Sequence, residues 1–246
     1  MTVEDESVLD RPARAPDATL AYGADPDQVA DIRYGGLGAA QRPLLAILHG
    51  GFWRPRYDRL HVGPMADALA ARGWTVASIE YRRVPGSPDA TVNDVALALS
   101  RLPQLANAHN GRVVAIGHSA GGHLALLAPG APSMLAGIVA LAPAADLRLA
   151  RDLNLGAGAV HAFLGIEPEH RTDLDPQLRA APNATTIIVH GEDDEVVPIA
   201  LAEAYCARHT TVDLVRLPGC GHFALIDPLS AAWLQVIEAI QRLSVR

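Results

Sequence analysis

The 246-residue sequence contains no lysine, so its 20 lysine and arginine positions are all arginine. A Schiff-base enzyme, a P-loop nucleotide site and a Ser-Lys dyad each need a lysine amine, and the sequence therefore excludes all three. Positive charge is also scarce, because the formal net charge is −7 at pH 7. This balance argues against a nucleic-acid partner, whose phosphates need a basic face to neutralise them.

The sequence also lacks the features of secreted, membrane and metal-binding proteins. Its two cysteines, Cys206 and Cys220, are too few for a disulfide framework, have no zinc-site spacing, and no H-E-x-x-H motif occurs. The acidic first ten residues show no signal peptide, and no apolar run reaches the roughly 20 residues of a membrane span. We therefore expect a cytoplasmic protein with no membrane partner, no metal and no cofactor. The oligomeric state is left open.

Length and composition predict one folded domain. Half of the residues are hydrophobic (50%) and 19% are charged, so the chain can bury one large core. Residues 1–16 are acidic and then interrupted by two prolines, which favours a flexible N-terminal arm. The folded domain is expected over residues 17–246.

Short apolar segments alternate with segments of helical periodicity. The predicted strands, apolar throughout and rich in β-branched residues, are 43–49, 74–81, 112–117, 137–141, 185–190 and 212–217. The predicted helices, with apolar residues three or four apart, are 65–72, 91–102, 120–127, 199–208 and 229–243. This order predicts an α/β fold with a mostly parallel sheet, helices on both faces and ligands at the carboxyl ends of the strands. Residues 144–183 break the alternation and are expected to form an insertion or small lid.

The sharpest chemical signal is the segment 117–123, GHSAGGH, which follows a predicted strand and opens a predicted helix. A serine on such a tight turn adopts an unusual backbone conformation, and glycines two positions away on either side relieve the crowding. This nucleophile-elbow pattern makes Ser119 the predicted nucleophile. The helix that follows adds a positive dipole end where negative charge would develop.

A serine hydroxyl needs a histidine to take its proton, and the histidine needs a carboxylate to orient it. Two downstream loops, each after a predicted strand, supply both groups: 191–198, GEDDEVVP, and 219–223, GCGHF. The expected base is His222, and the expected acid is Asp194. Cys220 is expected to be an inert thiol, because no turn presents it as a nucleophile.

A third motif, HGGFWR at residues 49–54, directly follows a predicted strand. A carbonyl under attack becomes an oxyanion, which needs backbone N–H donors, and glycines let the backbone approach it. The predicted donors are the N–H groups of Gly51, Phe52 and Ala120.

Further residues near this loop are candidates for substrate contact. Phe52 and Trp53 are expected either to line a pocket or to pack in the core, and the fixed charge of Arg54 is suited to a substrate carboxylate. His49 is expected to brace the loop. The segment 80–82, EYR, is expected to form a structural hydrogen-bonding corner, with the rim of a pocket as the second interpretation.

Together these motifs resemble those of α/β-hydrolases over nearly the whole chain, from residue 22 to residue 223. In that superfamily the motif H-G-x-x-D-x-x-V-P carries the triad acid, which aligns with Asp194. The H-G-G-x-W loop and the G-H-S-A-G-G elbow are similar to those of kynurenine formamidases and related small carboxylesterases. The resemblance implies a single-domain α/β-hydrolase with a minimal lid.

We therefore expect a serine hydrolase that cleaves a carboxylic ester or an aryl formamide of a small-molecule substrate through an acyl-enzyme. The motifs are shared between esterases and formamidases, so both bond types stay open. An alternative of another class is a catalytically silent, ligand-binding module of the same fold. A broken triad or oxyanion loop would indicate that alternative, and neither is broken in this sequence.

Overall fold

The computed structural model describes residues 4–128 and 134–244. Within them eight strands form one sheet in the order β1-β2-β4-β3-β5-β6-β7-β8. The strands are β1 (Ala18–Ala21), β2 (Val29–Arg33), β3 (Leu44–Leu48), β4 (Val76–Ile79), β5 (Val113–His118), β6 (Leu135–Leu141), β7 (Thr185–Gly191) and β8 (Asp213–Leu217). Strands β3 to β8 are parallel, so the predicted mostly parallel sheet is confirmed.

The antiparallel pair β1 and β2 extends the sheet beside β4 and was not predicted. These strands are short and carry polar residues such as Thr19, Asp31 and Arg33, so they lack the continuous apolar run by which the other strands are recognised. Asp31 and Arg33 of β2 become part of a cavity described below.

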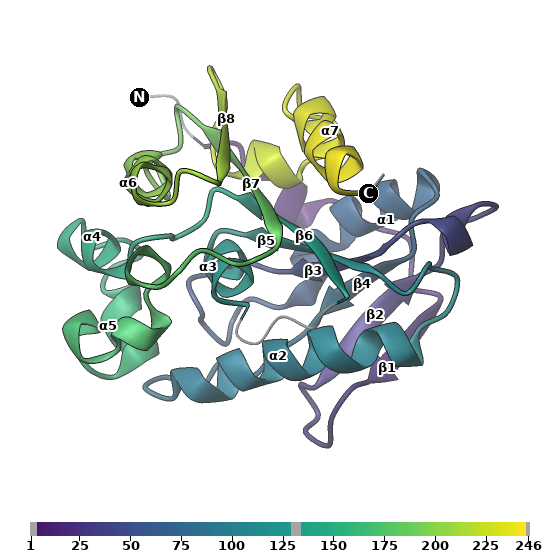
Figure 1. Cartoon of the computed structure of the whole chain (residues 1–246), viewed down its shortest axis with the longest axis horizontal. Coiled ribbons are helices and arrows are strands. Elements are labelled where there is room, and N and C mark those ends of the chain that lie inside the picture. The colour runs from purple at the N-terminus through teal and green to yellow at the C-terminus, as the bar shows by residue number, and fades with distance from the viewer. Residues whose placement is uncertain (1–3, 129–133, 245–246) are drawn as a thin grey trace.

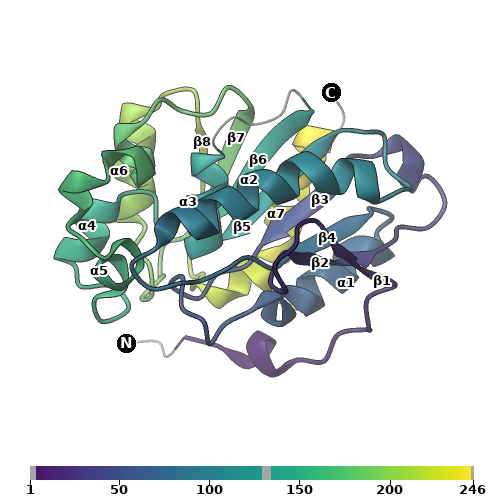
Figure 2. The same ribbon diagram turned by 90° about the horizontal axis from the view of Figure 1, so that it is seen from below.

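Helices cover both faces of the sheet (Figures 1 and 2). They are α1 (Gly63–Ala71), α2 (Pro88–Leu105), α3 (Ala120–Leu127), α4 (Leu147–Asp152), α5 (Ala159–Leu164), α6 (Ala200–Arg208) and α7 (Trp233–Ser244). In both views α2 lies on one side of the sheet and α1 and α7 lie on the other. Within the described residues, no helix is both long and apolar enough to cross a membrane.

The core has two halves, one on each side of the sheet, because successive strand residues point to opposite faces. In β3, Leu44, Ala46 and Leu48 pack with α2 and α3. Leu45 and Ile47 pack on the other face with α1 and α7. The sheet is therefore buried on both faces, which explains why its central strands are apolar throughout.

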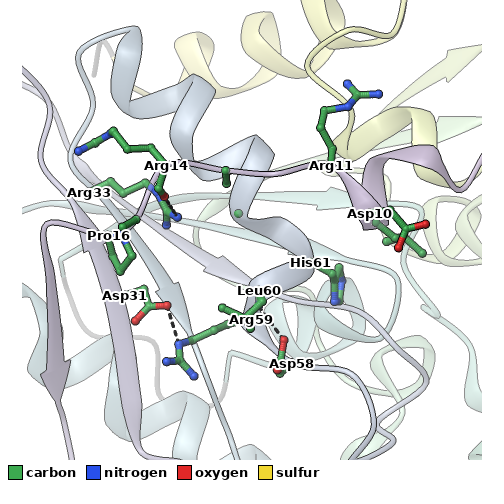
Figure 3. A pocket seen from close by; sticks show the side chains of 14 residues that line it. Asp10, Arg11, Arg14, Pro16, Asp31, Arg33, Asp58, Arg59, Leu60 and His61 are labelled. Carbon is green, nitrogen blue, oxygen red and sulfur yellow. Dashed lines mark hydrogen bonds and ion pairs between the residues drawn. The ribbon is translucent and has the colours of Figure 1, made fainter.

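The N-terminal segment, residues 4–16, lies against the domain, and Figure 3 shows Asp10, Arg11 and Arg14 along it. A 3-10 helix, Ser7–Asp10, buries Val8 to 1% exposure, and Arg11 NH2 donates to Asp227 Oδ2 over 3.1 Å. Residues 1–3 of the predicted arm lie outside the described residues, as do residues 245–246 of the predicted domain. The flexibility of the arm stays a prediction.

The stretch 144–183 contains α4, α5 and the three 3-10 turns Pro168–His170, Thr172–Leu174 and Pro176–Leu178. Helix α5 packs into the core through Val160, Phe163 and Leu164. Beside the turns, the buried Asp175 accepts hydrogen bonds from the N–H groups of Leu147 and Gln177, each over 3.2 Å. Whether this stretch acts as a lid stays a prediction.

Candidate active site

The predicted motifs meet at the carboxyl edge of the sheet because they follow neighbouring parallel strands. Leu48 at the end of β3 pairs with Gly117 near the end of β5. Gly191 at the end of β7 pairs with Leu217 at the end of β8. The loops after β3, β5, β7 and β8 therefore leave the sheet on the same side.

Ser119 sits in the strained turn between β5 and α3. Its φ of 57° and ψ of −117° lie outside the regions that residues with a side chain ordinarily occupy. The chain packs closely around it: a methyl group on Gly117 would lie 2.1 Å from the Gly121 oxygen, and one on Gly121 would lie 2.1 Å from the Leu48 oxygen. These two glycines allow the turn to form against β3 and present Ser119 at the strand end.

His222 and Asp194 are in direct contact. His222 Nδ1 donates to Asp194 Oδ2 over 2.7 Å, and both side chains are buried. The other carboxylate oxygen of Asp194 accepts the N–H groups of Val196 and Val197 over 2.9 and 2.7 Å. The N–H groups of its own loop thus fix the Asp194 carboxylate. The carboxylate in turn holds the His222 imidazole at Nδ1, and Nε2 takes no part in this bond.

Electrostatics keep Asp194 ionised. Burial would raise the pKa of its carboxyl, but hydrogen bonds from His190 and His222 and from the Val197 N–H hold that pKa below its usual range. His190 Nε2 lies 3.4 Å from Asp194 Oδ2 and donates to the Val197 oxygen over 2.8 Å. His190 and His222 therefore approach the same carboxylate oxygen of Asp194.

The predicted oxyanion loop has a left-handed backbone over three consecutive residues. Gly51, Phe52 and Trp53 have φ values of 107°, 53° and 56°. A methyl group on Gly51 would lie 2.4 Å from Tyr57 Cβ, so only glycine fits there. In the described parts of the chain, the N–H groups of Gly51, Phe52 and Ala120 make no backbone hydrogen bond outside regular elements, which leaves them available.

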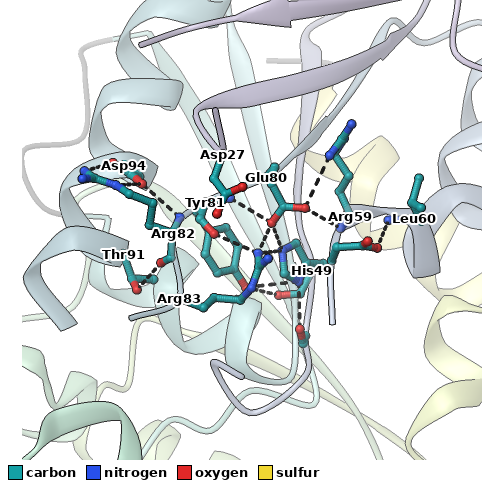
Figure 4. Close-up of polar contacts among 12 residues, drawn as sticks. Asp27, His49, Arg59, Leu60, Glu80, Tyr81, Arg82, Arg83, Thr91 and Asp94 are labelled. Carbon is teal, nitrogen blue, oxygen red and sulfur yellow. Dashed lines mark hydrogen bonds and ion pairs between the residues drawn. The ribbon is translucent and has the colours of Figure 1, made fainter. Parts of the chain in front are cut away.

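His49 and Glu80 brace this loop in a buried polar network (Figure 4). His49 Nδ1 lies 2.8 Å from the Gly50 oxygen, and His49 Nε2 lies 3.0 Å from Glu80 Oε1. Arg83 NH1 contacts the same Glu80 oxygen. Burial lowers the pKa of His49 to about 3, and the ring serves as a support for the loop. Tyr81 adds a bond from its hydroxyl to the His49 oxygen over 2.6 Å.

A cavity of about 70 Å³, here called the catalytic cavity, joins these groups. The residues that line it are Glu6, Leu9, Gly51, Phe52, Tyr57, His61, His118, Ser119, Val196, His222 and Phe223. Ser119 and His222 thus face the same space as two of the three predicted oxyanion residues. Leu9 and Glu6 bring the N-terminal segment over this space.

Trp53 and Arg54, the predicted substrate contacts, do not line the catalytic cavity. Trp53 is 4% exposed, donates from Nε1 to His123 Nδ1 over 3.3 Å and stacks on Phe163 at 4.7 Å. Arg54 NH2 contacts the Gly156 oxygen and lies 3.4 Å from the Ala157 oxygen. Both residues therefore join the loop after β3 to the stretch 144–183.

Four residues of the site were missed at the sequence level. His61 and His118 line the catalytic cavity, and each has a buried Nδ1 with no partner among the described residues. His190 supports Asp194. Its place directly before the G-x-x-D segment is the sequence signal that could have identified it. Both carboxylate oxygens of Glu4 accept the His222 N–H over 2.9 Å, a contact with no sequence signal. Within residues 4–128 and 134–244, no group of three or more candidate ligands could hold a metal.

Two family models match the sequence. The model of the prolyl oligopeptidase family matches residues 84–235, more than half of the chain. The BD-FAE model matches residues 31–134. The two matches together include the elbow, the predicted acid and the predicted base.

Known esterases are similar to this chain in sequence and in fold. Esterase LipC of Mycobacterium tuberculosis (strain ATCC 25618 / H37Rv) is 27% identical over an alignment of length 250 that covers 85% of this chain. The match spans only 60% of the length of that relative. Esterase B of Lactobacillus rhamnosis has a TM-score of 0.76 at 20% identity, with 97% of this chain and 90% of that chain covered. A truncated carbohydrate esterase from gut microbiota has a TM-score of 0.78 at 16% identity, with 95% and 100% covered. These structures confirm the predicted α/β-hydrolase fold.

Proposed function

Because the chain belongs to the prolyl oligopeptidase family of α/β-hydrolases, we propose that it is a serine hydrolase cleaving a carboxylic ester through an acyl-enzyme. The observation that carries the proposal is the 2.7 Å bond between His222 Nδ1 and Asp194 Oδ2, with His222 and Ser119 on one cavity. The similarity to an esterase of 27% identity supports the choice of an ester.

In the first half of the reaction, Ser119 Oγ attacks the carbonyl carbon and its proton passes to His222 Nε2. The Nδ1–H bond to Asp194 fixes the tautomer that leaves Nε2 free, and the ionised Asp194 stabilises the imidazolium that forms. The carbonyl oxygen becomes an oxyanion and accepts the N–H groups of Gly51, Phe52 and Ala120. Collapse expels the alcohol, which takes the proton from His222.

In the second half, a water gives a proton to His222 and attacks the acyl group on Ser119. The same three N–H groups hold the second oxyanion. Its collapse breaks the bond to Ser119 Oγ, which recovers the proton, and the carboxylic acid leaves. The chain's own residues thus balance every proton in the cycle.

The volume of the catalytic cavity, about 70 Å³, favours a short acyl group. A site for a complete drug-sized ligand occupies about 300–1,000 Å³, so this space holds only part of a substrate. A formyl group would fit as well as an acetyl group, which supports aryl-formamide cleavage as a second candidate activity.

We also place the protein in the cytoplasm. The cysteines support this, because Cys206 and Cys220 are free thiols and burial raises the pKa of each to about 11. Such thiols stay protonated and react slowly at neutral pH.

The test compares kcat/KM for p-nitrophenyl acetate, p-nitrophenyl butyrate and N-formylkynurenine. The proposal predicts measurable turnover of the acetyl ester and a fall of about 10³-fold or more in kcat for His222→Ala. A higher kcat/KM for the formamide would select the second candidate. An intact, folded protein with no turnover of any of the three would favour the silent ligand-binding alternative.

A further inference from the structure

A second and larger cavity, here called the arginine cavity, is drawn in Figure 3, and two of its lining residues also line the catalytic cavity. Its volume is about 430 Å³, which is within the range of small-molecule sites. The lining comes from the N-terminal segment, β2 and the turn before α1: Leu9, Asp10, Arg11, Ala13, Arg14, Ala15, Pro16, Asp31, Arg33, Asp58, Arg59, Leu60, His61 and Gly63. Four arginines face three aspartates there.

Arg33 differs from the other arginines of this cavity. Arg11 pairs with Asp227, Arg14 with Asp17 and Asp67, and Arg59 with Asp31. No ion pair within the described ranges includes Arg33, although its residue is only 5% exposed.

The polar atoms of Arg33 are also incompletely bonded. Its NH2 donates to the Arg14 oxygen over 2.7 Å, while its Nε is buried with no partner within the described residues. The charges of Asp67 and Asp31 favour the charged form of Arg33, but these carboxylates form their ion pairs with Arg14 and Arg59. A buried guanidinium with no ion-pair partner of its own is costly, since charge taken from water needs a partner. An anion in the arginine cavity would supply that partner.

The two cavities share part of their walls. Leu9 and His61 line both of them, so the two cavities adjoin at these side chains. Burial lowers the pKa of His61 to about 3, so its ring is neutral and does not compete with Arg33 for an anion. The catalytic cavity alone is too small for a whole substrate, and the arginine cavity provides the missing volume.

We propose that the arginine cavity binds a carboxylate on the alcohol portion of the ester, with Arg33 as its charged contact. A guanidinium presents N–H donors in a planar fork that matches a carboxylate. The short acyl group occupies the catalytic cavity, and the alcohol portion passes between Leu9 and His61. This inference rests on the hydrolase function proposed above and names its substrate class as anionic esters with a short acyl group.

The test measures kcat/KM for 4-acetoxybenzoate and for its neutral counterpart, methyl 4-acetoxybenzoate, and takes their ratio. The wild-type protein should prefer the anionic ester. Arg33→Met should lower the ratio at least about tenfold, the loss expected when a charged hydrogen bond is removed. Because Arg33 is buried, a second variant keeps the test valid if that protein does not fold. Ala13→Glu places a carboxylate at the exposed edge of the cavity and should also lower the ratio, while the matched Ala13→Gln should not.

Calorimetric titration with benzoate separates this inference from the proposed function, because binding does not require turnover. Benzoate binding to wild-type protein that is lost in Arg33→Met supports the site even if no ester is cleaved, and the hydrolase proposal alone then fails. If the neutral ester is cleaved while the wild type shows no preference for the anionic ester and no benzoate binding, the anion site is overturned and the hydrolase proposal stands.

Discussion

Both carboxylate oxygens of Glu4 lie 2.9 Å from the backbone nitrogen of His222. Glu4 Oε1 also accepts the Glu195 N–H over 3.2 Å. The carboxylate thus connects the loop that carries Asp194 with the loop that carries His222. It approaches closely because position 221 is glycine, where a methyl group would lie 2.4 Å from Glu4 Oε2.

Glu4 is therefore expected to act as a positioning residue for His222. Glu4→Ala should lower kcat about tenfold with a smaller change in KM, because a displaced imidazole affects the chemical step more than substrate binding. Glu4→Gln, which keeps an oxygen acceptor, should recover part of the activity. Asp5→Asn is the matched control, since Asp5 accepts the N–H of Ser7, a neighbour in its own segment. Equal kcat for wild type and Glu4→Ala would contradict this role.

Gly121 should tolerate no side chain. A methyl group there would lie 2.1 Å from the Leu48 oxygen and 2.5 Å from the His49 oxygen, and backbone atoms cannot move aside cheaply. Gly121→Ala should lower the free energy of unfolding by about 1–3 kcal/mol, measured by urea denaturation. Gly36→Ala is the control, because that site has no atom within 4 Å. If both variants lose equal stability, the close packing of the elbow is not the cause.

Arg54 makes its hydrogen bonds with the stretch 144–183, so its replacement should affect stability more than substrate binding. Arg54→Ala should cost about 1 kcal/mol of unfolding free energy, as expected for a lost hydrogen bond to a carbonyl. The exposed Arg208→Ala serves as the control variant. A selective rise in KM for anionic esters in Arg54→Ala would instead assign Arg54 to the substrate.

Asp175 should make stability fall as pH rises. Burial raises the pKa of its carboxyl from 3.8 to about 6, while hydrogen bonds from Leu147 and Gln177 oppose the shift. Below pH 3.8 both states hold the proton, and between pH 3.8 and about 6 only the folded state keeps it. The free energy of unfolding should therefore fall by about 3 kcal/mol across this window.

Asp175→Asn removes this titration. Urea denaturation from pH 4 to 8 should show the variant gaining stability relative to wild type up to about pH 6, and a constant difference above it. Asp173→Asn is the control, because the Asp173 side chain is exposed and the hydrogen bond from Arg171 lowers its pKa, which is the opposite direction. Parallel stability curves for wild type and Asp175→Asn would contradict the expected shift.

The sequence predicted those parts of the fold and site that depend on local pattern. The elbow around Ser119 and the left-handed loop at Gly51 need glycine at fixed offsets, so short motifs identify them. The central strands are buried on both faces and leave continuous apolar runs.

Contacts between distant segments were beyond such patterns. Glu4 and His222 are 218 positions apart, and no periodicity links them. Arg33 lies on a short polar strand that was not predicted, so its burial without a carboxylate is visible only in three dimensions. The sequence likewise gives no sign that the backbone oxygens of Gly156 and Ala157 lie beside Arg54. Without these partners, a substrate carboxylate was the expected contact of its charge.

The central claim is that Ser119 is the nucleophile activated by His222 and Asp194. The most direct measurement is labelling with a fluorophosphonate, followed by mass spectrometry of the peptide that carries the adduct. The account predicts one adduct, on Ser119, that is absent in Ser119→Ala and strongly slowed in His222→Ala. A folded Ser119→Ala protein that still labels and still hydrolyses p-nitrophenyl acetate at the wild-type rate would contradict it.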